Sequence, residues 1–229
     1  MELIAQALQW LADPESWSGD GGIWARLAEH LAITIVVVLI SAVITIPVGV
    51  VVGHRRRGTV GVALVAGAAR AVPTLGLLTL LGLAVGIGLV APMIALIVLA
   101  APSILAGTYS GVMAVSSEVV DGARAQGMSE MQIVFGIEIP LAAPALLGGI
   151  RSATLQVVAT ATLAAYVADA GLGRYIFMGL KTRNYAELIA GSLLVVALAL
   201  LLDGIFVLIQ KRFSFRSNAT RHHLTERTS

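Results

Sequence analysis

The chain has 229 residues, of which 58% are apolar and only 12% are charged, with a formal net charge of +2. A soluble domain carries about 25% charged residues, so this composition excludes an ordinary soluble protein, and the small net charge argues against nucleic-acid binding. There is no cysteine, which excludes disulfides, iron–sulfur clusters and thiolate zinc sites, and the four histidines are not arranged as a metal site.

The first 27 residues are predicted to form an N-terminal interfacial or extracytoplasmic segment. Residues 1–11 repeat apolar side chains at helical spacing, which is typical of a short helix lying in the membrane interface. Asp13-Pro14 and the glycine-rich residues 19–22 then end that helix. The segment has no basic n-region and no small-residue cleavage site after an apolar run, so we do not expect a signal peptide.

Five apolar stretches follow, and each is long enough to cross a bilayer, whose core of about 30 Å needs roughly 20 residues of helix. They cover about residues 31–52, 59–85, 90–112, 144–168 and 187–209. The second stretch is interrupted by Arg70 and Pro73, and Gly82, Gly86 and Gly88 mark its end. We therefore predict an all-α, polytopic membrane protein with one transmembrane domain over residues 28–212 and a polar tail over residues 213–229.

Loop charge predicts the orientation, because cytoplasmic loops carry an excess of Lys and Arg. Ten basic residues fall on one predicted side: Arg55, Arg56, Arg57, Arg124, Arg151, Lys211, Arg212, Arg216, Arg221 and Arg227. Four fall on the other: Arg26, Arg174, Lys181 and Arg183. The pattern predicts a multi-pass membrane protein with its N-terminus outside and its C-terminus in the cytoplasm.

A polar segment, residues 115–143, separates the third and fourth spans on the predicted cytoplasmic side. No charge occurs between Arg70 and Glu118, and five charged residues then arrive within 21 positions. Ser116 or Ser117 can cap a helix over about 115–126, which Gly127 can end in a left-handed conformation. Ser129 can cap a second helix through residue 135, and Pro140 and Pro144 mark re-entry into the membrane. This compact pair of helices indicates a docking surface, the alternative being a solvated loop.

The same segment resembles the Glu-Ala-Ala loop of permeases from binding-protein-dependent ABC importers, a pattern that ends nine residues after its glycine in Ile-x-Leu-Pro. Asp121-Gly122-Ala123 stands at the Glu-Ala-Ala position, Gly127 at the glycine, and Ile137-Glu138-Ile139-Pro140 at the end. The departures are Asp for Glu, Gly for the first Ala and Ile for Leu. The resemblance implies a loop that docks on a separate ATPase subunit. Its implied coupling residues are Glu118, Asp121, Gly122, Ala123, Gly127, Ile137, Ile139 and Pro140.

Flanking stretches are similar to the osmoprotectant branch of that family, which imports glycine betaine, choline, carnitine or proline betaine. These stretches are residues 71–75, 149–154, 159–166 and 171–173. The resemblance implies a fold of the type I importer permease kind, with about five transmembrane helices. It also implies a dimer of ATP-binding subunits, an extracytoplasmic substrate-binding protein, a second permease copy or paralogue, and surrounding membrane lipid as partners. The implied location is the cell membrane of a prokaryote.

The chain has no GxxxxGK[ST] phosphate-binding loop, so we do not expect it to hydrolyse ATP or to be an enzyme. ATP and Mg²⁺ are expected in the partner ATPase, with no cofactor or metal in this chain. The rival hypotheses are an ABC permease for another small solute, such as an amino acid or a metal chelate, and a stand-alone secondary transporter. A scaffold without a transport role would leave the spacing of the polar segment unexplained.

Polar residues within spans are costly and tend to face protein or water, which makes them candidates for the translocation path. The candidates are Arg70, Pro73, Thr74, Gln156, Thr160, Thr162 and Tyr166. The threonines can instead bond a carbonyl one turn back, and Arg70 can extend to the membrane interface. Asp203 is expected either to bond a neighbouring helix or to lie near the inner surface.

Aromatic residues make up only 5% of the chain, and no cluster in the sequence suggests a tight cage for a quaternary ammonium group. This agrees with a translocating subunit whose substrate affinity comes from a separate protein. The polar hairpin of residues 171–184 is the expected contact for that protein, the alternative being a solvated loop.

Overall fold

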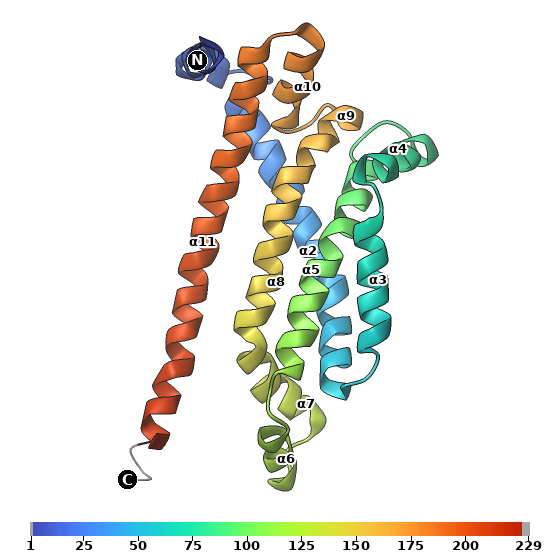
Figure 1. The fold of residues 1–229 in the computed structure, drawn as a ribbon, viewed down its shortest axis with the longest axis vertical. Helices are drawn as coiled ribbons and strands as arrows, with labels where there is room; N and C mark the ends of the chain where they lie inside the picture. The colour runs from blue at the N-terminus through green and yellow to red at the C-terminus, as the bar shows by residue number, and fades with distance from the viewer. Residues whose placement is uncertain (1, 226–229) are drawn as a thin grey trace. The chain divides into compact units, whose positions relative to one another are not determined.

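A computed structural model describes the backbone of residues 2–225 and the side chains of residues 2–212. Within this part of the chain every regular element is helical. The predicted polar tail, residues 213–229, lies outside the residues whose side chains are described. In chain order the main helices (Figure 1) are α1 (Glu2–Ala12), α2 (Ile23–Arg55), α3 (Thr59–Ala71), α4 (Thr74–Val85), α5 (Val90–Met113), α6 (Ser117–Ala125), α7 (Glu130–Ile133), α8 (Ile139–Thr160), α9 (Ala164–Ala168), α10 (Gly173–Thr182) and α11 (Tyr185–Thr225).

Among the described residues, four helical stretches are long and apolar enough to cross a membrane, which agrees with four of the five predicted spans. They are Ile23–Arg55, Val90–Met113, Glu130–Ala168 and Tyr185–Arg212. The predicted N-terminal helix is also present as α1. A further 3₁₀ turn, Pro14–Trp17, begins at the Asp13-Pro14 pair that was expected to end α1.

The predicted second span is not one straight helix. It is broken into α3 and α4, which are bent by 82° relative to each other, and it makes a fifth span only if the pair is counted together. Pro73 lies at the break as the N-cap of α4. Proline lacks an N–H and disfavours helical conformation in the preceding residue, so the sequence favours a break at this position.

Helical structure extends beyond the predicted start of the fourth span, near residue 144, whereas re-entry into the membrane at Pro140 and Pro144 stays a prediction. Helical structure begins at Glu130 with α7 and continues through a π-helical turn, Val134–Glu138, into α8. Pro140 directly follows the π-helical turn, at the second residue of α8. Pro144 is accommodated inside the helix, as prolines in membrane helices often are.

The chain forms two compact units, and the boundary between them falls within five of the helices. Unit 1 comprises residues 1–41, 69–100 and 154–202, and unit 2 comprises residues 42–68, 101–153 and 203–229. Each unit contains a segment of short helices that connects one long helix to the next. In unit 2 this segment is α6 with α7, and in unit 1 it is α9 with α10.

Unit 2 is held together by close approach of its helices at small residues. A Cβ on Gly107 of α5 would lie 2.8 Å from the Cα of Gly149 on α8, and one on Gly53 of α2 would lie 2.6 Å from Val112 Cβ. Small residues allow such approach, which is how membrane helices gain van der Waals contact without a hydrophobic driving force between them. The same unit contains a pair of hydrogen bonds from Arg151 to Asp203, at 2.7 and 2.9 Å. This confirms that Asp203 bonds a neighbouring helix.

Unit 1 has a core that joins the start of α2 to α8, α10 and α11, with the buried residues Ile23, Val158, Leu172, Tyr175, Val195 and Leu198. The Tyr175 hydroxyl donates to the Gly21 carbonyl at 2.8 Å. Burial raises the pKa of Tyr175, so its phenol stays protonated and available as a donor. The ring of Tyr175 also meets Trp10 of α1 edge to face, with centroids 5.2 Å apart.

Candidate functional site

The polar segment between α5 and α8 folds into two capped helices, as predicted. The Ser116 side chain accepts from the Glu118 N–H at 3.2 Å and caps α6. Ser129 forms a reciprocal capping box with Gln132, in which each side chain accepts from the other residue's backbone N–H. These contacts satisfy N–H groups that have no partner within their own helix. We refer to residues 115–133 as the knob (Figure 1).

The turn between the two helices depends on Gly127, which adopts φ +85° as predicted. Its N–H donates to the Arg124 carbonyl at 2.9 Å, and the Met128 N–H donates to the Ala123 carbonyl at 3.2 Å. This pair of bonds is a Schellman motif, which ends a helix and needs a residue that tolerates positive φ. The predicted end of the second helix at residue 135 is wrong, because the π-helical turn carries the chain on without a break.

The knob has its own small core. Val115, Val120, Ala123 and Ile133 are buried together, and Met128 and Ile137 pack against them. Burial of these apolar side chains offsets the conformational entropy that is lost when the helix pair becomes ordered. The predicted alternative of an ordinary solvated loop therefore does not describe this segment.

A chain of charged contacts surrounds this core and extends to α2. Arg124 donates to both oxygens of Glu130, at 2.8 and 3.0 Å, and to Asp121 at 2.9 Å. The hydrogen bonds with Glu130 and then Asp121 raise the pKa of the Arg124 guanidinium, which remains charged. His54 on α2 places one ring nitrogen 3.1 Å from Glu130 and the other 2.8 Å from Glu138. Glu138 is only 2% exposed, so His54 supplies the hydrogen-bond partner of a buried carboxyl group.

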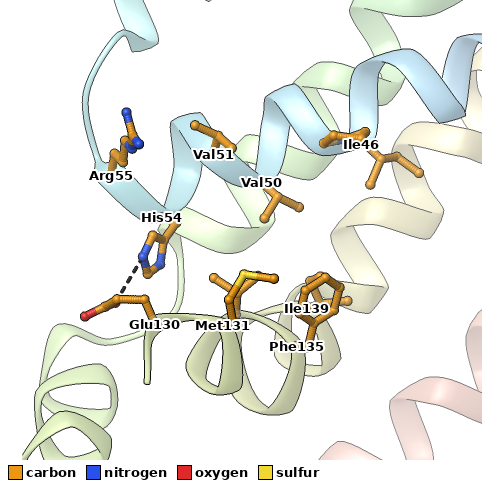
Figure 2. A pocket seen from close by; sticks show the side chains of 11 residues that line it. Ile46, Val50, Val51, His54, Arg55, Glu130, Met131, Phe135 and Ile139 are labelled. Carbon is orange, nitrogen blue, oxygen red and sulfur yellow. Dashed lines mark ion pairs between the residues drawn. The ribbon is translucent and has the colours of Figure 1, made fainter. Parts of the chain in front are cut away.

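An apolar groove of about 550 Å³ lies beside these charged side chains. It lies between α2 and the segment from α7 into α8, and Figure 2 shows Met131, Phe135 and Ile139 facing Val50 and Ile46 across it. The His54–Glu130 pair closes one end (Figure 2). Met131 and Phe135 are more than 60% exposed, although such side chains are usually buried in a finished assembly.

The residues predicted to couple to a partner divide into two groups. Glu118, Asp121 and Gly122 are exposed on α6, whereas Ala123 is buried and Gly127 shapes the turn. Ile137 packs under the knob, Ile139 lines the groove, and Pro140 is exposed in the first turn of α8. The exposed group can touch a partner, and the other residues position it.

The residues predicted to line a path all belong to unit 1. Arg70 and Pro73 are exposed at the break between α3 and α4, and Thr74 begins α4. The Thr160 hydroxyl donates to the Gln156 carbonyl at 2.7 Å and the Thr162 hydroxyl donates to the Ala159 carbonyl at 2.8 Å. Both threonines are therefore satisfied within their own helix, as the alternative interpretation expected, and their part in a path stays a prediction.

The hairpin of residues 171–184 contains the helix α10, and side chains of α2 hold the turn before it. Arg26 donates to the Asp169 carbonyl at 2.8 Å, and Glu29 accepts from the Gly171 N–H at 2.9 Å. His30 lies 2.9 Å from the Val158 carbonyl through Nε2, which assigns the proton to that nitrogen. Its Nδ1 then accepts from the Leu172 N–H at 3.3 Å.

Sequence reasoning missed His54, Arg124, Glu130 and Glu138 as members of the site. Arg124, Glu130 and Glu138 were counted among the five charges of the polar segment, but their contacts with one another and with His54 were not predicted. A usable signal was present, because the four acidic residues of the polar segment and His54 all fall at the same predicted membrane face.

Comparisons of the sequence and of the fold with known proteins all match components of transport systems. Residues 45–216 match the family described as binding-protein-dependent transport system inner membrane component. The chain is 28% identical to the choline transport system permease protein OpuBB of Bacillus subtilis, over 86% of this chain and 91% of that protein. It is 29% identical to the glycine betaine/carnitine/choline transport system permease protein OpuCB of the same organism, over 85% and 90%. The fold resembles a chain of the inward-facing MetNI methionine ABC transporter, with a TM-score of 0.72, 24% identity, and coverage of 83% and 95%.

Proposed function

This chain belongs to the family of binding-protein-dependent transport system inner membrane components, and we propose that it translocates a small quaternary-ammonium osmoprotectant. It is a multi-pass membrane permease of an ABC importer, and ATP hydrolysis belongs to a separate subunit. Choline, glycine betaine and carnitine are the candidate substrates, because these solutes appear in the names of the similar permeases.

The knob is the proposed contact with the ATP-binding subunits, and its geometry carries this proposal. It combines a self-contained core with an exposed face formed by Glu118, Asp121 and Gly122. A compact body whose Glu130 contacts His54 of a long helix passes on a displacement better than a solvated loop does. Closure of the ATPase dimer would move the knob and, through α2 and α8, change access to the path.

We refer to residues 164–182, which contain α9 and α10, as the α9–α10 turn. The proposed orientation places the knob in the cytoplasm and the α9–α10 turn outside. The distribution of basic residues supports it, with ten on the knob side and four on the other. A second permease copy or paralogue completes the assembly, since the two motor subunits of an ABC importer need two docking surfaces. An extracytoplasmic binding protein would deliver the substrate at the α9–α10 side.

Purification of the tagged chain in mild detergent, followed by mass spectrometry and uptake measurements in proteoliposomes, tests the proposal. We expect an ATP-binding subunit and a permease partner to co-purify, and ATP-dependent uptake of radiolabelled glycine betaine or choline. Excess unlabelled glycine betaine should compete, and excess methionine should not. Uptake that proceeds with the chain alone would contradict the docking role, and competition by methionine alone would contradict the substrate class.

A further inference from the structure

A second pocket, of about 410 Å³, lies between α9 and α10 within unit 1. Its size is within the range of small-molecule sites, which typically measure about 300–1,000 Å³. It combines aromatic, thioether and charged groups, and its principal lining residues are Tyr166, Asp169, Arg174, Phe177, Met178 and Lys181.

One part of the pocket is suited to a methylated ammonium group. The rings of Tyr166 and Phe177, eleven positions apart in the chain, lie with centroids 5.7 Å apart and tilted by 50°. Tyr166 is 59% exposed, so a ring face is free to meet a ligand. Aromatic faces attract cations, and the Met178 thioether adds a polarizable neighbour. Two rings in mutual contact form an open platform rather than a closed cage, which suits weak and transient binding.

One of the two basic side chains in the pocket has no ion-pair partner among the described side chains. Asp169 is already paired with Arg174 across the α9–α10 turn. Lys181 makes no hydrogen bond or ion pair within the part of the chain whose side chains are described. Phe177 and Lys181 are four residues apart on α10 and so share one face of the helix, about one turn from each other. An aromatic surface and an uncompensated ammonium group are thus adjacent in one pocket.

We propose that this pocket is a transit subsite for zwitterions that carry both a quaternary ammonium group and a carboxylate, such as glycine betaine or carnitine. Tyr166 and Phe177 receive the methylated ammonium, and Lys181 receives the carboxylate. Choline has the ammonium group but no carboxylate, so it gains from the rings alone. This inference rests on the proposed function and adds a preference among its candidate substrates.

The test uses the complete importer, purified through a tag on this chain, reconstituted, and supplied with saturating binding protein. Uptake of radiolabelled glycine betaine and choline is measured together with binding-protein-stimulated ATP hydrolysis. For Lys181→Met we expect maximal glycine betaine uptake to fall roughly three- to tenfold, the range for losing a partly exposed charged contact. Choline uptake and ATP hydrolysis should stay near wild type, and Lys181→Arg should restore glycine betaine uptake.

Arg183→Met is the matched control, because it removes a cation from the same hairpin but outside the pocket. It should produce no preference between substrates. Phe177→Leu should lower uptake of both substrates, because it removes the shared aromatic surface. Equal loss of both substrates and of stimulated ATP hydrolysis in Lys181→Met would overturn the subsite and indicate binding-protein docking instead. Unchanged glycine betaine uptake, or a wild type that imports choline and not glycine betaine, would also overturn it. A wild type that imports neither substrate would instead refute the proposed function.

Discussion

The knob and the α9–α10 turn both interrupt long helices, but different contacts hold them. The knob has its own core and caps, and its Glu130 contacts the side chain of His54 on α2. The turn has less internal structure, and Arg26, Glu29 and His30 of α2 hold its backbone. The first arrangement suits a body that transmits displacement as a unit, and the second suits a segment whose conformation follows α2.

The largest expected effect comes from breaking the knob at its turn with Gly127→Pro. Proline fixes φ near −65° and has no N–H, whereas Gly127 has φ +85° and donates to the Arg124 carbonyl. We expect uptake in proteoliposomes to fall to background while membrane insertion of the chain is retained. Gly127→Asn is the control, because asparagine tolerates this conformation. Wild-type uptake by the proline variant would show that the turn does not matter for coupling.

Gly173→Ala is the corresponding break in the α9–α10 turn. A Cβ at this position would overlap the backbone carbonyl of Thr162, which cannot move aside as a flexible side chain can. Overpacking of this kind costs about 1–3 kcal/mol and sometimes more. We expect a clear fall in the thermal denaturation midpoint of the detergent-solubilised protein. An unchanged midpoint would mean that the α9–α10 contacts are looser than described.

The link between the knob and α2 is tested by comparing His54→Leu with Arg124→Ala. Removing His54 leaves the buried Glu138 carboxylate without its partner, a loss of about 1–3 kcal/mol. Arg124 pairs with exposed carboxylates, and such contacts contribute at most about 1 kcal/mol each. Thermal denaturation should therefore rank His54→Leu as the more destabilised variant. The reverse order would place the main attachment of the knob elsewhere.

Gly122→Ala gives the smallest expected effect and is the counterpart of Gly173→Ala. Nothing lies within 4 Å of a Cβ at Gly122, and alanine favours helix by up to about 1 kcal/mol over glycine. The midpoint should rise slightly and uptake should be kept, because the related loop pattern carries alanine at this position. Strong loss of uptake with normal stability would mean that the partner approaches the backbone more closely here than the pattern suggests.

The sequence was sufficient for features that depend on neighbouring residues. Ser116, Gly127 and Ser129 act on groups within a few positions of themselves, so their capping roles could be predicted. The pairing of His54 with Glu138, and of Tyr166 with Phe177, depends on packing between separate helices. The break at Pro73 was signalled locally, but no local pattern predicts its angle of 82°.

Site-specific cross-linking from α6 tests the central claim, that the knob docks on the motor subunit, most directly. The chain has no native cysteine, so Glu118→Cys provides a single exposed attachment point for a photo-reactive probe. In the purified, transport-competent complex we predict a cross-link to the ATP-binding subunit from Glu118→Cys and none from Arg183→Cys. A transport-competent complex in which the probe at residue 118 labels only lipid or solvent would contradict the coupling role.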